Sequence, residues 1–201
     1  MINKPKYKIC KRLGAGVFDK CQTQKFAVSE AKKSNKKGKK PKALSDYGVQ
    51  FIEKQKIRYS YGVTEKQFSN YVKDAMATKS GSAADKLYEM LESRLDNVVY
   101  RFGLGSTRAL ARQIVSHGHL MVNGHRTTIP SYRLKVGDVI KIREGSKNKV
   151  LFQELPKKLK NYAYPAWLKF DAEKGEGEVI GKPVNSETFL NFNTMIEFYS
   201  R

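Results

Sequence analysis

The sequence predicts an α+β fold, in which a mostly helical part is followed by a small antiparallel sheet. Three observations support this class. Apolar residues recur at helical spacing between residues 45 and 117, an Asn-Gly pair separates two extended runs within 120–126, and short apolar segments follow toward the C-terminus. A length of 201 residues allows one large or two small domains with a hydrophobic core.

The first helix is expected to begin at Ser45 or Asp46 and to run to about Arg58. Either side chain can accept a hydrogen bond from a backbone N–H group that the first helical turn leaves without a partner. Gly62 is expected to end this helix, because glycine readily adopts the left-handed conformation in which many helices stop.

A capping box, Thr64-Glu65-Lys66-Gln67, marks the start of the second helix. In this motif the threonine hydroxyl accepts from one backbone N–H and the glutamine side chain accepts from another. The apolar residues behind it recur at i, i+3, i+4 and i+7: Phe68, Tyr71, Val72 and Ala75. Ser82 starts a third helix, with Leu87, Tyr88, Met90 and Leu91 as its apolar residues. We interpret both apolar faces as parts of a core.

Two short helices are expected next. Their apolar faces are Leu95, Val98, Val99 and Phe102 in the first helix, and Ala111, Ile114 and Val115 in the second. Gly103 and Gly105 end the first of these helices. Ser106 is expected to cap the second, and Gly118 to end it.

Extended segments dominate the rest of the chain. Asn123-Gly124 predicts a hairpin, because both residues tolerate the left-handed conformation that a tight turn requires. Further strands are predicted at 139–142 after a Gly-Asp turn, and at 167–170 and 178–180 on either side of a Gly-rich turn. Residues 194–199 are predicted to form a last apolar strand.

The composition points to a polyanionic partner. Lys and Arg total 39 against 19 Asp and Glu, so the net charge is +20 and the pI is about 9.9. Basic side chains that neutralise phosphates release condensed counterions, and such a pI is typical of nucleic-acid-binding domains. A membrane is not expected as partner, because no apolar run approaches the roughly 18 residues of a transmembrane helix. Folded RNA is the polyanion we expect.

The N-terminal region, residues 1–43, is predicted to be a basic extension. Residues 1–42 hold 14 Lys or Arg and 2 acids, a net charge of +12. The run 32–42 contains 7 lysines and no apolar residue, so it is expected to be disordered alone and to become ordered on phosphates. Met1-Ile2-Asn3-Lys4-Pro5 lacks the apolar stretch of a signal peptide, which favours a cytoplasmic location.

The chain has two cysteines, Cys10 and Cys21. A disulfide framework needs more cysteines and an oxidising compartment, and a zinc site usually needs four nitrogen or sulfur ligands. We therefore expect two reduced, partly buried thiols, no metal site and no cofactor.

Four stretches make the chain resemble the small-subunit ribosomal protein S4 family over nearly its full length. They are Leu44-Ser45-Asp46-Tyr47-Gly48-Val49-Gln50 with Glu53-Lys54-Gln55-Lys56; Tyr61-Gly62-Val63 with Glu65-Lys66-Gln67-Phe68; residues 94–142; and Pro165-Ala166-Trp167-Leu168 with Ile196-Glu197-Phe198-Tyr199-Ser200-Arg201. The third stretch resembles an RNA-binding module that several proteins share, whereas the flanking motifs make the match specific.

The resemblance implies a mostly helical first domain with an inserted small α/β RNA-binding module, made of two helices and a small antiparallel sheet. The expected divisions are a basic extension at 1–43, a helical domain at 44–92, the module at 93–156 and C-terminal strands at 157–201. These strands are expected to return to the first domain and complete it. The chain departs from the family at its N-terminus, where many members carry four cysteines as a zinc site and a Pro-Gly-Gln-His-Gly turn.

The resemblance also implies a structural component of the small ribosomal subunit. Such a protein binds small-subunit rRNA early and directly, at a multi-helix junction of the 5′ domain, and nucleates assembly. It lies beside ribosomal protein S5 near the mRNA entry path and influences decoding accuracy. Two other classes stay open: a free RNA-binding regulator, and an RNA-modifying enzyme that shares the module. No enzymatic activity is expected, because the sequence has no Gly-rich phosphate loop, metal-ligand cluster or nucleophile elbow.

Twelve residues are candidate RNA contacts. In the module they are Arg94, Arg101, Arg108, Arg112, His117, His125 and Arg126, and in the first domain they are Lys54, Lys56, Arg58, Tyr61 and Lys66. Arginine suits this role because its guanidinium binds phosphate bidentately and stacks on bases. The alternative for each cation is a solvated surface charge, and Arg94 has the further alternative of pairing with Asp96 or Glu92.

Overall fold

The computed structural model describes residues 5–34, 43–78, 81–159, 162–185 and 188–200. It divides into two compact units, one made of Met1–Leu87 with Ser186–Arg201 and the other of Tyr88–Asn185. The lysine run predicted to be disordered lies outside the described residues from position 35 onward, and its first three residues belong to a helix.

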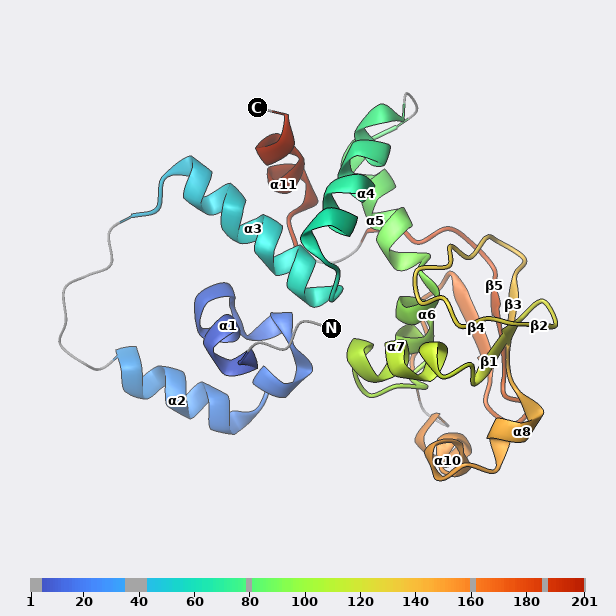
Figure 1. The fold of residues 1–201 in the computed structure, drawn as a ribbon. Helices are drawn as coiled ribbons and strands as arrows, with labels where there is room; N and C mark the ends of the chain where they lie inside the picture. The colour runs from blue at the N-terminus through green and yellow to red at the C-terminus, as the bar shows by residue number, and fades with distance from the viewer. Residues whose placement is uncertain (1–4, 35–42, 79–80, 160–161, 186–187, 201) are drawn as a thin grey trace. The chain divides into compact units, whose positions relative to one another are not determined.

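The first unit is helical (Figure 1). Its elements are α1 (Lys6–Leu13), the 3-10 turns η1 (Ala15–Val17) and η2 (Asp19–Cys21), α2 (Gln24–Ser34), α3 (Asp46–Ser60), α4 (Glu65–Ala77), the first part of α5 (Ala83–Glu92), and α11 (Phe192–Tyr199). The predicted caps are confirmed. Ser45 accepts from the backbone N–H of Gly48, Thr64 and Gln67 form both halves of the capping box, and Gly62 adopts φ 63° where α3 ends.

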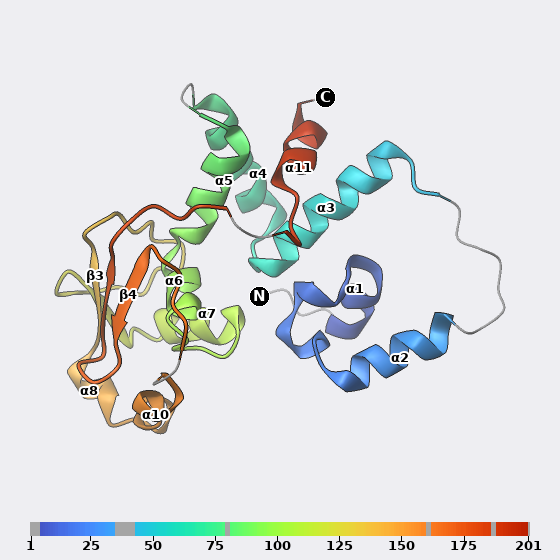
Figure 2. The ribbon, with the colours of Figure 1, turned by 180° about the vertical axis from the view of Figure 1, so that it is seen from behind.

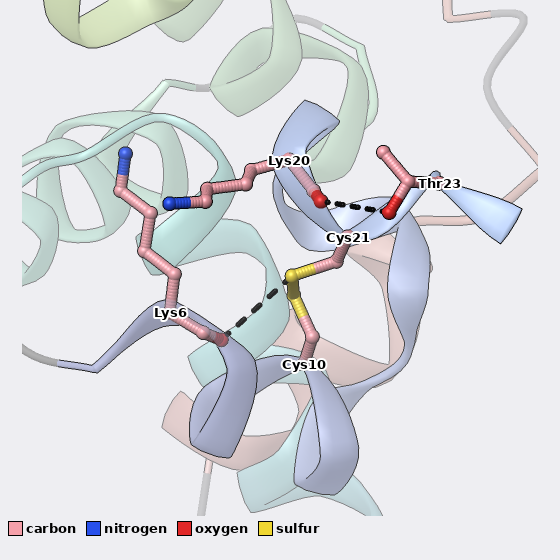
Figure 3. Close-up of a disulfide and its surroundings, with 5 residues drawn as sticks. All are labelled: Lys6, Cys10, Lys20, Cys21 and Thr23. Carbon is pink, nitrogen blue, oxygen red and sulfur yellow. Dashed lines mark hydrogen bonds between the residues drawn. A yellow bond between two sulfur atoms is a disulfide. The ribbon is translucent and has the colours of Figure 1, made fainter. Parts of the chain in front are cut away.

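The N-terminal segment forms a small core together with Tyr59 of α3. The buried residues of this core are Cys10, Leu13, Val17, Cys21, Phe26 and Tyr59. Cys10 and Cys21 form a disulfide, so the prediction of two reduced thiols is wrong (Figure 3). The bend at Gly14 and the two 3-10 turns bring the cysteine Cα atoms to 6.5 Å, which is within disulfide reach.

The C-terminal segment 192–199 is a helix, so the prediction of a strand at 194–199 is also wrong. Asn191 caps this helix by accepting from the backbone N–H of Thr194 at 3.0 Å. Phe192 and Met195 are buried one helical turn apart, and Phe198 contacts the rings of Tyr47 and Phe51 on α3. A short apolar run does not by itself distinguish a strand from a buried helix.

The second unit contains the α/β module. After the end of α5 it holds α6 (Leu95–Arg101), α7 (Arg108–Ser116), β1 (Leu120–Val122), β2 (His125–Arg126), β3 (Val139–Ile142), the short helices α8 (Glu144–Lys147), α9 (Val150–Gln153) and α10 (Leu155–Leu159), β4 (Leu168–Asp171) and β5 (Glu176–Val179). The five strands form one antiparallel sheet in the order β2-β1-β3-β5-β4. Helices α6 and α7 lie together on one side of it (Figures 1 and 2).

The C-terminal strands complete the sheet of the module and not the first domain, which corrects the predicted division at 157–201. Strand β5 pairs with β3, with Val139 opposite Glu178 and Ile140 opposite Gly177. The last segment, Ser186–Arg201, which contains α11, belongs to the first unit. The pairing brings the Phe170 ring to 4.9 Å from that of Phe102, so β4, β5 and α6 share one core.

The predicted hairpin is confirmed. Asn123 and Gly124 adopt φ values of 49° and 81°, and Val122 pairs with His125. The Asn123 amide also ties the turn to β3, because it donates to Asp138 at 2.8 Å and accepts from the backbone N–H of Val139 at 2.9 Å. The cap of α7 is Thr107, which accepts from Leu110 N–H, and not the predicted Ser106.

Candidate nucleic-acid interface

The start of α6 is fixed by backbone contacts from a loop after the hairpin. Leu95 N–H donates to the Tyr132 carbonyl at 2.9 Å, and Asp96 N–H donates to the Pro130 carbonyl at 3.1 Å. These bonds satisfy N–H groups that a helix start leaves open, and Arg94 at the N-cap position provides no side-chain cap. The side chains that project from α6 and α7 therefore have a well-anchored base.

Two buried carboxylates organise the arginines of the module. Glu92, the last residue of α5, is fully buried and receives both Arg101 Nε and an Arg101 terminal nitrogen at 2.8 Å. Asp96, also buried, receives Arg94 Nε at 3.0 Å and an Arg94 terminal nitrogen at 2.7 Å. Each carboxylate thus has one bidentate arginine, the geometry in which a buried ion pair is best compensated.

Two further arginines from α7 approach the same carboxylates. Arg108 lies 3.9 Å from Glu92, donates to the Asn97 amide oxygen at 2.8 Å and stacks 4.6 Å from the Tyr100 ring centre. Arg112 lies 3.9 Å from Asp96. Four guanidiniums and two carboxylates leave this cluster with a net charge of +2.

The exposed members of this cluster form what we term the arginine row: Arg101, Arg108 and Arg112. Their side chains are 22%, 21% and 26% exposed, so each guanidinium is anchored on one side and open to solvent on another. Arg94 differs, because its side chain is 0% exposed. The structure thus shows the alternative predicted for Arg94, a buried pair with Asp96, and this burial disfavours RNA contact by Arg94.

A second group of cations lies where α7 ends. His117, His125 and Arg126 are exposed, as their predicted role requires. His119 is buried, with Nδ1 3.1 Å from the Ser146 hydroxyl. Burial lowers the pKa of His119 below its ordinary value, and neighbouring cations lower it further. These neighbours are Lys149, His117, Arg143 and Arg126.

Sequence reasoning missed Arg143 and Lys149 in this group. Both follow β3 and become neighbours of His119 only because the backbone N–H of Arg143 donates to the His119 carbonyl at 2.9 Å. It also missed Asn97 and Tyr100 as supports of Arg108. The signal available was their spacing, since Asn97 and Tyr100 are three residues apart and share a face of α6.

The first-domain candidates divide by burial. Tyr61 is 3% exposed, and Lys54 is buried in an ion pair with Glu65 and lies over the rings of Phe198 and Tyr199, so neither offers a surface to RNA. Burial tends to lower the pKa of Lys54, but hydrogen bonds with Glu65 and Tyr199 outweigh it and the pKa is raised. Direct RNA contact by Lys54 and Tyr61 stays a prediction, which the burial of both residues disfavours.

The remaining first-domain candidates are more accessible. Lys56 pairs with Glu53 at 2.5 Å, and Arg58 donates to the Gln55 amide oxygen at 2.7 Å; both side chains are partly exposed. Lys66 is exposed on the first turn of α4. These three residues stay candidates for phosphate contact.

Neither cysteine offers a free thiol to a metal ion. Cys10 and Cys21 are bonded to each other, and within the described ranges no group of three His, Cys, Asp or Glu side chains could hold a metal ion. In the same part of the chain, no helix is both long and apolar enough to cross a membrane.

Comparison with known proteins places this geometry in a family. The model of the ribosomal protein S4/S9 N-terminal domain matches residues 2–92, and that of the S4 domain matches residues 93–140. The small ribosomal subunit protein uS4 of Chromobacterium violaceum is 44% identical over 98% of this chain and 97% of its own length. The chain belongs to the uS4 family.

Other uS4 proteins are similarly close. That of Syntrophomonas wolfei is 42% identical over 96% of this chain and 95% of its own length, and that of Neisseria meningitidis is 45% identical over 98% and 97%. The two family-model matches meet between Glu92 and Ser93. Glu92 therefore ends one uS4 segment while its carboxylate binds arginines of the next.

Proposed function

We propose that this chain is a structural constituent of the small ribosomal subunit and binds small-subunit rRNA directly. The observation that carries the proposal is the arginine row, which the uS4 module presents on two helices anchored to one sheet. The net charge of +20 supports a polyanionic partner. The family is not an enzyme family, and the function that the site supports is recognition.

Binding combines charge neutralisation with recognition of shape. Each guanidinium that contacts a phosphate releases condensed counterions, so affinity falls as salt rises. The A-form major groove is too narrow for side chains to enter, so folded RNA is recognised mainly through its backbone and its shape. A row of arginines on a rigid unit matches phosphates only where the RNA holds them at a fixed spacing, and this gives preference for a folded site.

The finer role that we propose is the one that the resemblance to the family implies. The chain binds at the multi-helix junction of the 5′ domain, nucleates subunit assembly, and acts on cytoplasmic ribosomes beside ribosomal protein S5 near the mRNA entry path, where it influences decoding accuracy. The basic N-terminal region, with a net charge of +12 over residues 1–42, supports an extended contact with rRNA beyond the module. His117, His125, Arg126, Lys56, Arg58 and Lys66 are the further phosphate contacts that we propose.

The test is binding of the purified chain to a 5′-domain rRNA transcript, compared with an unfolded RNA of matched length. We expect a preference for the folded transcript, and Arg108→Ala with Arg112→Ala should lower both the affinity and the salt slope, the latter by about 1.4–1.8. Lys169→Ala with Lys174→Ala is the matched control, because it removes the same charge from exposed positions on the β4–β5 hairpin. Equal binding of both RNAs by the native chain would overturn the proposal.

A free regulator of translation is the second candidate. Sedimentation of cell extract separates the two, because a subunit constituent migrates with the small subunit at moderate salt. Recovery of the chain only from the free fraction would favour the regulator.

A further inference from the structure

One acidic residue occupies an unexpected position for a protein that binds a polyanion. The Glu92 carboxylate contacts both Arg101 and Arg108 of the arginine row and is fully buried. A negative charge here lowers the local positive potential and so weakens the attraction for phosphate. Attraction therefore does not explain why an acid stands at this place.

We propose that Glu92 is a positioning residue for RNA binding: it holds Arg101 directly, and Arg108 through Asn97, in the orientation that contacts phosphate. This inference rests on the proposed function and adds to it the element that sets the geometry of the row.

Both carboxylate oxygens of Glu92 take part in this arrangement. One accepts from an Arg101 terminal nitrogen at 2.8 Å, and the other accepts from Arg101 Nε at 2.8 Å and from Asn97 Nδ2 at 2.9 Å. Asn97 Nδ2 also lies 3.2 Å from the Glu92 backbone carbonyl. These two bonds fix the Asn97 amide with its oxygen toward Arg108, whose Nε donates to it at 2.8 Å.

The benefit of this arrangement is that the arginines are ordered before RNA arrives. Immobilising one flexible side chain at an interface reduces affinity by about 2- to 12-fold. Because of Glu92, the side chains of Arg101 and Arg108 are already ordered in the free protein. The bidentate contact with Arg101 also compensates the desolvation cost of burying the Glu92 carboxylate. An unpaired buried acid would have no such compensation.

The proposal predicts the sign of a substitution. Glu92→Gln removes a negative charge, so attraction alone predicts tighter RNA binding. Positioning predicts weaker binding, because either oxygen of the carboxylate faces an N–H donor and the NH2 group of glutamine would meet that donor. We expect a loss of about tenfold in affinity for the folded transcript, which corresponds to about 1.4 kcal/mol.

Asp85→Asn is the matched control. Asp85 lies on the same helix, α5, is exposed, and loses the same charge on substitution. We expect the affinity of Asp85→Asn for the folded transcript to equal or slightly exceed that of the native chain. If Glu92→Gln behaves like Asp85→Asn, the acid has no positioning role and the proposal is overturned.

A double-mutant cycle separates positioning from a general structural role. If Glu92 acts through the arginines, Glu92→Gln weakens the native chain but has little further effect when Arg101→Ala and Arg108→Ala are already present. If it acts by disturbing the module as a whole, the loss is the same in both backgrounds. Additive losses therefore overturn the proposal, and non-additive losses support it.

The cycle also distinguishes this inference from the proposed function. Native binding with preference for the folded transcript, together with additive losses, leaves the function intact and refutes positioning alone. Absence of that preference in the native chain refutes both. Should Glu92→Gln fail to fold by circular dichroism, Asn97→Ala replaces it, because it breaks the link to Arg108 without a change of charge. Asn97→Ala should lower the RNA affinity of the native chain. The same substitution should leave the RNA affinity of the Arg108→Ala variant unchanged.

Discussion

The absence of a side chain at Gly177 allows the rings of Phe102 and Phe170 to pack against β5 in the core of the module. It lies on β5 opposite Ile140, and a Cβ atom there would stand 2.5 Å from the Phe102 ring and 2.7 Å from the Phe170 ring. Gly177→Ala should therefore lower the free energy of unfolding by about 1–3 kcal/mol through overpacking. Urea denaturation followed by circular dichroism measures the change.

Gly181→Ala is the control for this prediction, because its Cβ would meet Trp167 at 3.7 Å, an ordinary contact distance. Its free energy of unfolding should stay within about 0.5 kcal/mol of the native value. Equal stability of both variants would show that the two phenylalanine rings do not enclose Gly177.

His119 should make stability depend on pH. Its pKa in the folded chain is lowered below the ordinary value of 6.5, so the unfolded chain binds more protons between the two pKa values. The free energy of unfolding should therefore fall as pH decreases through the range just below 6.5, and this loss should be complete below the folded pKa.

Denaturation of the native chain and of His119→Gln, at several values between about pH 5 and 8, checks this expectation. The acid-dependent loss should be smaller in His119→Gln, which keeps a polar group beside Ser146. His125→Gln is the control, because His125 is exposed and is not among the neighbours that lower the pKa of His119. Identical pH profiles for the native chain and His119→Gln would contradict the assignment.

Burial divides the predicted site residues into accessible and enclosed ones, and the sequence alone does not reveal this division. The sequence identifies Arg108 and Arg112 as neighbours on one helical face, and the structure places them together with exposed edges. It does not reveal that Arg94 is buried, because that depends on the 130–134 loop, which lies far along the chain and covers the start of α6. Lys54 is likewise enclosed by rings of α11, which come from the other end of the sequence.

At the scale of elements, local signals predicted the capping box and the hairpin turn, but the cap of α7 is Thr107, one residue after the predicted Ser106. The capping box at Thr64 and the turn at Asn123-Gly124 each involve residues within a few positions, and both form as predicted. The strand prediction at 194–199 failed because it relied on an apolar run alone. The overlooked signal is Asn191, a residue type that favours the helix N-cap. Its side chain accepts from the backbone N–H of Thr194, three positions later.

This cap provides a test of α11. Asn191→Ala should lower the free energy of unfolding by about 1 kcal/mol, because the N–H of Thr194 loses its acceptor. Asn191→Asp should retain the stability, since a carboxylate caps as well as an amide and favours the positive end of the helix. Thermal denaturation of the three proteins measures the effect, and equal melting temperatures would argue against capping by this side chain.

The disulfide at the N-terminus shows what composition cannot decide. Two cysteines in 201 residues argue against a disulfide framework, and that argument is sound for a whole domain. It does not address a local pair whose approach depends on a bend at Gly14 and two 3-10 turns. The same bend creates the core that also takes in Tyr59 of α3.

Across the whole molecule, the sheet and the charge are each assembled from distant parts of the sequence. Strand β3 pairs with β5 although 33 residues, 143–175, lie between them, so no local pattern indicates that β4 and β5 belong to the module. Charge, by contrast, is additive along the chain and is readable directly. Residues 1–42 carry a net +12, whereas residues 171–201 carry 3 basic and 6 acidic side chains, a net −3.

This uneven charge predicts separate roles for the lysine run and the arginine row. Replacement of Lys36, Lys37, Lys39, Lys40 and Lys42 by glutamine removes five charges without shortening the chain or altering α2. If each lysine neutralises one phosphate, the slope of log affinity against log salt should become less steep by about 3.5–4.5. Isothermal binding or filter binding at several salt concentrations provides this slope.

The ratio of affinities for folded and unfolded RNA should stay nearly constant in the same variant. A lysine ammonium acts as a point charge that attracts any phosphate, whereas an ordered arginine row depends on phosphate spacing. The variant with arginine at all five positions is the control, since it keeps the charge and should keep the slope. A loss of preference for folded RNA in the glutamine variant would show that the run contributes to recognition of shape and not only to attraction, and an unchanged slope would place these lysines away from the RNA.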